Sequence, residues 1–150
     1  LQNHQLILAG KRGWKYDEVL RSVSRSRFGH RIKMIGYVSH ADKLQLIRNA
    51  KLFAFPSLWE GFGLPVVEAM ALGTPVVTSS VSSLPEIVGR SAITVNPESV
   101  QAIAKGIASL LTSPARQKRL RALGKRRAKK FTWENAAAET MKIYMQIAIH

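Results

Sequence analysis

Short apolar runs alternate with segments of helical periodicity along the chain. Such runs are predicted to be strands at residues 5–9, 31–35, 51–55, 75–78 and 92–95. Between and after them, apolar residues recur at helical spacing, which predicts helices over residues 16–27, 40–49, 65–72, 85–88, 98–111, 114–129 and 133–149. Apolar strands that alternate with helices are typical of a parallel sheet covered by helices on both faces. The pattern therefore predicts an α/β fold.

Local signals support several of the predicted helix ends. Ser39 can cap the second helix, with Asp42 three residues later as in a capping box. Pro65 suits the first turn of a helix, where its missing N–H group costs nothing, and Gly73 suits the end of that helix. Thr132 is the expected cap of the last helix.

Composition narrows the classes of protein that fit. The chain has 150 residues, enough for one domain, and 46% of them are hydrophobic, which allows a sizeable core. The absence of cysteine excludes disulfides and zinc–thiolate sites. No apolar run approaches the roughly 20 residues that cross a bilayer. The chain begins without methionine just before a strand, which suggests a piece of a longer protein, and a cytoplasmic location is expected.

The net charge of +14 is concentrated in one segment and favours anionic partners. No acidic residue lies between Glu98 and Glu134. We call residues 116–130 the basic segment; its cations are Arg116, Lys118, Arg119, Arg121, Lys125, Arg126, Arg127, Lys129 and Lys130. Leu120 and Leu123 are expected to face inward. The segment is either a solvated helix face or a peripheral contact with an anionic membrane, at the inner face of that membrane. Nucleic-acid binding is disfavoured, because the segment contains no aromatic residue.

Ligands of a parallel α/β sheet bind at the carboxyl ends of its strands, so the loops there are the candidate sites. These loops cover residues 10–15, 36–40, 57–64 and 79–84. The third leads from Glu60 through two glycines into a helix that carries Glu68. Glycines allow close approach of the backbone to a ligand, and the amides of a helix start bind phosphate.

Glu60 and Glu68 flank this phosphate position. Carboxylates would repel a phosphate, but they accept hydrogen bonds from sugar hydroxyls. The spacing therefore predicts a nucleotide sugar as the ligand. The alternative is that Glu60 is a solvated loop charge and Glu68 a surface residue of the helix. Trp59 and Phe62 are interpreted as core or loop packing, with lining of the sugar pocket as the alternative.

Residues 57–77, SLWEGFGLPVVEAMALGTPVV, closely resemble the signature of the family 4 glycosyltransferases, which are retaining enzymes of the GT-B fold. Glu60 and Glu68 correspond to the E-x7-E pair of that signature. The resemblance continues through residues 82–86 and covers nearly the whole chain. It implies that residues 1–150 are a Rossmann-like, nucleotide-sugar-binding domain, the C-terminal half of a GT-B glycosyltransferase.

The resemblance also implies roles for individual residues. Glu68 would bind the ribose hydroxyls, and Glu60, the candidate catalytic residue, would bind hydroxyls of the transferred sugar. The diphosphate and sugar would meet the backbone of Gly61, Phe62, Gly63 and Leu64. The nucleobase would face the loop of Gly36, Tyr37 and Val38. No metal or other cofactor is expected, and the resemblance points to a mannosyl or glucosyl donor.

Two parts of the family pattern are not found in these 150 residues. The family's Arg and Lys that clamp the diphosphate belong to a strand–helix unit expected upstream, and Lys11 and Arg12 do not match them. Those two residues are interpreted as solvated loop charges. The acceptor-binding N-terminal domain is also expected upstream, so the chain alone is expected to lack complete catalytic machinery. A non-catalytic module that binds nucleotide sugar or a partner remains the alternative function.

Overall fold

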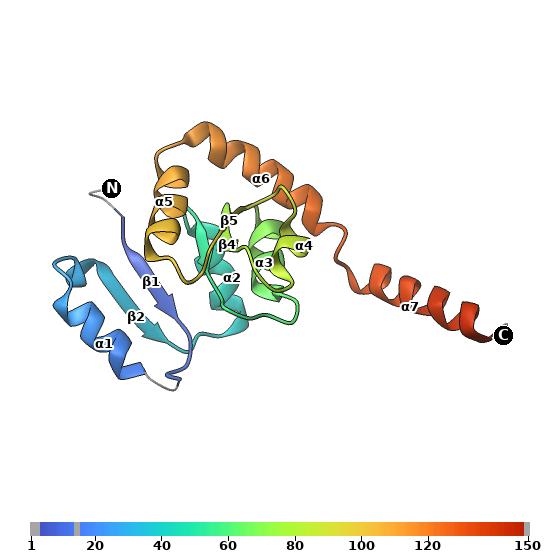
Figure 1. The fold of residues 1–150 in the computed structure, drawn as a ribbon, viewed down its shortest axis with the longest axis horizontal. Coiled ribbons are helices and arrows are strands. Elements are labelled where there is room, and N and C mark those ends of the chain that lie inside the picture. The colour runs from blue at the N-terminus through green and yellow to red at the C-terminus, as the bar shows by residue number, and fades with distance from the viewer. Residues whose placement is uncertain (1–3, 14–15, 149–150) are drawn as a thin grey trace. The chain divides into compact units, whose positions relative to one another are not determined.

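The computed structural model describes residues 4–13 and 16–148. The chain divides into two compact units, Leu1–Leu46 and Ile47–His150, and each is described by itself. The alternation of strands and helices predicted from the sequence is confirmed, with the five strands divided between two hydrogen-bonded parallel sheets (Figure 1).

The first unit contains two parallel strands and the helices that follow them. Its elements are β1 (Leu6–Ala9), α1 (Tyr16–Arg25), the 3₁₀ turn η1 (Gly29–Arg31), β2 (Ile32–Gly36) and most of α2 (His40–Asn49). Leu6 pairs with Ile32, and the register shifts between Leu8 and Ala9. The apolar run at residues 5–9 predicts a buried strand, and this prediction is wrong for the described unit, because Leu6 and Ile7 are exposed. The helices of this unit are too few to cover both faces of its two-stranded sheet.

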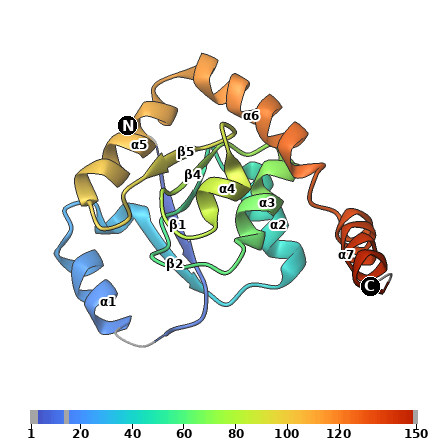
Figure 2. The same ribbon diagram turned by 45° about the vertical axis from the view of Figure 1, so that its right-hand side comes forward.

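The second unit is built on a three-stranded parallel sheet in the order β3-β4-β5. Its elements are β3 (Phe53–Phe55), α3 (Leu64–Leu72), β4 (Val76–Ser79), α4 (Leu84–Val88), β5 (Ile93–Val95), α5 (Val100–Leu111), α6 (Pro114–Ala128) and α7 (Trp133–Ala148). In Figure 2, α3 and α4 lie beside each other, and α6 runs from the end of α5 to pack against α3. The central strand β4 is buried along its whole length.

Two neighbouring residues of β4 show that helices cover both faces of this sheet. Successive side chains of a strand point to opposite faces. Val76 packs in a cluster with residues of α3 and α4, including Val66, Met70 and Ile87. Val77 packs in a second cluster, with Leu110 and Leu120 of α5 and α6 among its members. The four-residue strand therefore separates two hydrophobic cores, as a doubly covered sheet requires.

Helix α6 lies against α3 through small residues on its inner face. Leu120, Gly124 and Ala128 are buried at a spacing of four residues, and Gly124 brings the helix backbone close to Met70. Leu123 is partly buried against the second cluster, so both leucines predicted to face inward do so. Most cations of the basic segment point outward and are exposed, but Arg121 and Arg127 are half-buried.

Arg121 and Arg127 fasten α6 to the rest of the unit through backbone carbonyls. Arg121 donates to the carbonyl of Gly73 at 3.0 Å. Arg127 donates to the carbonyls of Ile87 at 2.9 Å and Glu86 at 2.6 Å, and its guanidinium lies 5.2 Å from the ring centroid of Phe131. These two cations therefore have a structural role, which the interpretation of the segment as a uniform charged face overlooked.

The helix ends predicted from local signals are confirmed. The Ser39 hydroxyl accepts a hydrogen bond from the amide of Asp42 and donates one to its carboxylate. Pro65 lies in the first turn of α3, and the Thr132 hydroxyl accepts from the amide of Asn135 at the start of α7. Helix α5 begins two residues later than predicted, because Ser99 caps it by accepting from the amide of Ala102. The predicted end of the last helix, at residue 149, lies outside the described residues.

Candidate functional site

The loop from β3 into α3 is fixed by a glycine that no other residue could replace without strain. Gly63 is the N-terminal cap of α3 and has a φ angle of 98°, in the left-handed region. A Cβ atom at this position would lie 2.6 Å from Cδ2 of the buried Leu84. Glycine is therefore required both by the turn and by the close packing of this loop on α4.

Several backbone amides at the start of α3 have no protein acceptor among the described residues; Gly61, Phe62 and Leu64 are exposed, whereas Gly63 is buried. The carbonyl of Gly63 accepts from the amides of Val66 at 2.9 Å and Val67 at 3.3 Å, so the first turn of the helix is satisfied internally. Within the described part of the chain, the amides of Gly61, Phe62, Gly63 and Leu64 donate to no protein group. Free amides at a helix start form a site for an anionic group such as phosphate.

Hydroxyl groups that follow β4 hold this loop in place. Ser82 donates to the carbonyl of Glu60 at 2.6 Å and accepts from the amide of Glu60 at 3.2 Å. Ser83 donates to the carbonyls of Glu60 at 2.9 Å and Phe62 at 3.1 Å. Deeper in the unit, the hydroxyls of Thr78 and Ser79 donate to the carbonyls of Phe55 and Ser57.

These contacts join the carboxyl ends of two adjacent strands. We refer to Ser82 and Ser83 as the serine clamp. Ser82 takes a φ of 59°, which is uncommon for a residue with a side chain. Residues 79–84 form one of the candidate loops predicted from the sequence, but no role is predicted there for these serines. The run of hydroxyl residues directly after a strand was the signal that could have identified them.

The two glutamates of the loop and helix are both half-buried. Glu68 lies one turn into α3, four residues after Leu64, and its Oε2 atom is buried. The interpretation of Glu68 as an ordinary surface residue is therefore wrong. Glu60 precedes the free amides, and its main chain is held by the serine clamp. The structure thus fixes both ends of the segment from Glu60 to Glu68.

The aromatic residues of the loop differ in their surroundings. Phe62 packs edge-on against Phe131, with ring centroids 5.7 Å apart. Trp59 is 80% exposed, so its interpretation as a packing residue is wrong. Its indole instead lies open beside the loop that carries Glu60, where a ligand can reach it.

Gly36, Tyr37 and Val38 belong to the first unit, at the carboxyl end of β2. The Gly36 carbonyl accepts from the amide of Gly10 at 2.8 Å, so the loops after β1 and β2 meet. Tyr37 is 70% exposed, and Lys11 Nζ lies 5.4 Å from its ring centroid. Arg12 lies 5.4 Å from the ring of Tyr16. Lys11 and Arg12 are both exposed, in agreement with their interpretation as solvated loop charges, and each lies near an aromatic ring.

Neither metal ligation nor membrane insertion has a candidate among the described residues. No group of three or more His, Asp or Glu side chains in residues 4–13 and 16–148 could hold a metal ion. No described helix is long and apolar enough to cross a bilayer. The expectation that the site works without metal stays a prediction.

The doubly covered parallel sheet, with its glycine-containing loop at the carboxyl ends of the strands, defines an α/β domain of the Rossmann-like class. A family model described as "Glycosyl transferases group 1" matches residues 1–128. The chain therefore belongs to the group 1 glycosyltransferase family. The match covers every residue of the two loops described above.

Individual relatives agree with this assignment. The chain is 40% identical over 141 residues to the O-antigen chain mannosyltransferase B of Escherichia coli, covering 94% of this chain and 37% of that protein. It is 41% identical over 111 residues to an MMP alpha-(1->4)-mannosyltransferase of Mycolicibacterium hassiacum, covering 71% of this chain and 27% of that protein. The chain thus spans only 37% and 27% of the length of these two relatives.

Solved structures show the same fold. The sucrose-phosphate synthase of Thermosynechococcus elongatus superposes with a TM-score of 0.84 at 29% identity, covering 97% of this chain and 39% of that one. A protein from Anabaena, solved in complex with UDP-glucose, superposes with a TM-score of 0.81 at 22% identity, covering 97% of this chain and 41% of that one. The Rossmann-like parallel α/β fold of a GT-B glycosyltransferase is confirmed.

Proposed function

We propose that this chain is the donor-binding part of a retaining family 4 glycosyltransferase. It binds a nucleoside-diphosphate sugar, with a mannosyl or glucosyl group as the transferred sugar. The observation that carries the proposal is the row of free amides from Gly61 to Leu64, placed between Glu60 and the half-buried Glu68. Mannosyltransferases among the relatives support the choice of sugar.

The amides are proposed to bind the diphosphate. As the glycosidic bond to the leaving diphosphate breaks, negative charge grows on the phosphate oxygens. Donors that are already fixed in place stabilise this charge without reorganising. The serine clamp provides that fixation, because it holds the carbonyls of Glu60 and Phe62. No metal ion is required for this role.

The two carboxylates are proposed to bind hydroxyl groups on either side of the diphosphate. Glu68 accepts from the ribose, and Glu60 accepts from the transferred sugar. Gly36, Tyr37 and Val38 face the nucleobase. Acceptor binding and the basic diphosphate clamp are assigned to parts of the protein beyond these 150 residues, which fits the 37% coverage of the mannosyltransferase relative. A non-catalytic binding module would bind the nucleotide sugar at the same site but would not transfer the sugar.

Calorimetric titration of the full-length protein with UDP and with GDP tests the donor site. Saturable binding of one of them, unchanged by EDTA, is expected. Binding of neither to the folded full-length protein, or binding only with added Mg²⁺, would contradict the proposal. A transfer assay on the full-length protein, using UDP-glucose and GDP-mannose, then separates an enzyme from a binding module.

A second proposal concerns the outer face of α6, which we propose contacts an anionic membrane surface. Seven cations of the basic segment are exposed, while Arg121 and Arg127 are held by carbonyl groups. Lys and Arg near an anionic leaflet each contribute about 1 kcal/mol. Sedimentation with phosphatidylglycerol vesicles is expected to capture the chain at low salt and to lose it at high salt. Recovery in the supernatant under both conditions would leave a solvated face.

A further inference from the structure

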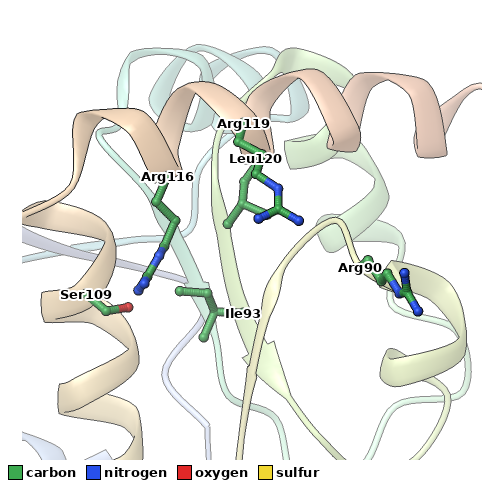
Figure 3. Close-up of a pocket in the computed structure, with 6 residues that line it drawn as sticks. All are labelled: Arg90, Ile93, Ser109, Arg116, Arg119 and Leu120. Carbon is green, nitrogen blue, oxygen red and sulfur yellow. The ribbon is translucent and has the colours of Figure 1, made fainter.

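Three arginines line a pocket on the second unit, away from the loop that carries Glu60. The pocket has a volume of about 310 Å³ and is lined by Arg90, Ile93, Ser109, Arg116, Arg119 and Leu120. Figure 3 shows Arg116 and Arg119 extending from α6, Arg90 from the turn before β5, and Ser109 from α5. Its volume lies at the lower end of the range for small-molecule sites, about 300–1,000 Å³.

The positive charge of this pocket is not neutralised by the protein. Among the described residues, the guanidinium groups of Arg90, Arg116 and Arg119 take part in no hydrogen bond and no ion pair. The sequence places no acidic residue between Glu98 and Glu134, so α6 brings none of its own. Arg116 also lies in the first turn of α6, where the helix dipole disfavours a positive charge.

The pocket is separate from the donor loop because the two lie at opposite ends of the strands. Ile93 is the first residue of β5 and marks the amino ends of the strands. The donor loop and the serine clamp follow β3 and β4, at the carboxyl ends. No residue is shared between the two places. A ligand in the pocket therefore does not compete with a nucleotide sugar for the same groups.

We infer that this pocket binds a phosphate group with two negative charges, as carried by a phosphate monoester or by inorganic pyrophosphate. Guanidinium groups bind the oxygens of phosphate through paired hydrogen bonds, which a diffuse set of lysines does not reproduce. The Ser109 hydroxyl already donates to the carbonyl of Gly106 at 2.8 Å, so the donors of this pocket are the arginines, and the side chains of Ile93 and Leu120 add an apolar lining. The inference goes beyond the proposed function and does not depend on it.

Calorimetry with inorganic pyrophosphate tests the site, in the wild type and in the triple variant Arg90→Gln, Arg116→Gln, Arg119→Gln. The variant Lys118→Gln, Arg126→Gln, Lys129→Gln removes the same charge from exposed positions of the basic segment that do not line the pocket. We expect the pocket variant to bind at least about tenfold more weakly, since charged hydrogen bonds are lost. The control should stay within about twofold of wild type, because its lost charges are solvent-screened.

Pyrophosphate could also bind at the donor loop, so NMR is used to locate the residues that bind it. The arginine Nε–H signals, assigned from the single variants, should shift for Arg90, Arg116 and Arg119 along one saturation curve. The signal of Arg126 should not follow that curve. Equal shifts of Arg126, equal losses in both triple variants, or no saturable effect on the pocket arginines would overturn the inference. UDP binding is measured separately, so failure of the pocket and failure of the donor site are distinguishable.

Sedimentation with lipid vesicles shows whether the phosphate belongs to a lipid headgroup or to a soluble ligand. Phosphatidic acid carries a phosphate monoester, whereas phosphatidylglycerol carries a diester. Capture by phosphatidic acid vesicles beyond that by phosphatidylglycerol vesicles of equal charge, lost in the pocket variant, identifies a lipid headgroup. Pyrophosphate binding without this preference identifies a soluble phosphate ligand. Either result supports a phosphate site in this pocket. Circular dichroism verifies that each variant is folded.

Discussion

The hydroxyl of Ser82 bonds both sides of one residue's main chain, donating to the carbonyl of Glu60 at 2.6 Å and accepting from its amide at 3.2 Å. Such a pair of bonds fixes the peptide orientation on each side of Glu60. With Ser83, which holds the carbonyls of Glu60 and Phe62, it determines where the free amides point.

Removing the serine clamp should therefore weaken donor binding more than it weakens folding. The variant Ser82→Ala, Ser83→Ala loses hydrogen bonds worth about 0.5–1.5 kcal/mol each. We expect roughly tenfold weaker binding of the nucleoside diphosphate by calorimetry. Ser80→Ala is the matched control, because Ser80 is exposed and its hydroxyl bonds no described residue. Equal effects of the two changes would show that the clamp does not position the loop.

Gly63 and Gly61 provide a matched pair for the turn before α3. Gly63→Ala combines a strained φ with contact against Leu84, and should reduce the free energy of unfolding by about 2–4 kcal/mol. Gly61→Ala meets nothing within 4 Å and should change it by less than about 1 kcal/mol. Urea denaturation followed by circular dichroism measures both. A Gly63 variant as stable as wild type would mean that the loop can rearrange.

The two glutamates should separate in a binding experiment. Glu68→Ala should lose about 1.5–3 kcal/mol of affinity for the nucleoside diphosphate, because a charged acceptor is removed. Glu60→Ala should leave that affinity unchanged and should lower turnover by the full-length protein. Unchanged affinity of the Glu68 variant for the nucleoside diphosphate would contradict the assignment of Glu68 to the ribose hydroxyls. Loss of nucleoside diphosphate binding in the Glu60 variant would sink the division of roles.

Arg127 and Arg126 are neighbours with different surroundings on α6. Arg127→Gln leaves the carbonyl groups of Ile87 and Glu86 without their charged donor and removes the contact with Phe131. We expect a melting temperature lower by roughly 5 °C or more. Arg126→Gln should leave it unchanged within about 1 °C, because Arg126 is exposed. Differential scanning calorimetry of the two variants decides between a structural and a purely surface role.

Glu134 at the start of α7 should titrate below the usual range. A backbone hydrogen bond at Glu134 and the Thr132 hydroxyl lower the pKa of its carboxyl. The ionised form is thus the one favoured in the folded chain. The ionised carboxylate stabilises the folded chain at pH values above the pKa that this carboxyl has in the unfolded chain. The stabilisation is lost as the pH falls through the lowered pKa of the folded chain. An NMR titration should show Thr132→Ala moving the Glu134 pKa upward; no movement would remove Thr132 as a cause.

The elements and the strand–loop–helix unit were predictable because their signals are local. Periodicity, Ser39, Pro65 and Thr132 act over a few residues, and each predicted the observed element or helix end. The serine clamp and Arg127 were missed because their partners are 21 to 41 residues away in sequence. Such pairings depend on how loops and helices pack, which no local pattern encodes. The exposure of Trp59 and of β1 was missed for the same reason.

Apart from Arg121 and Arg127, helix α6 keeps its packing and its charge on different residues. Leu120, Gly124 and Ala128 hold the inner face, and the exposed cations project outward without bonds to the sheet. Substitution of an outward cation therefore changes the surface potential while the architecture stays the same. The charge of this surface can therefore be raised or lowered by single substitutions without altering the packing beneath the candidate loop.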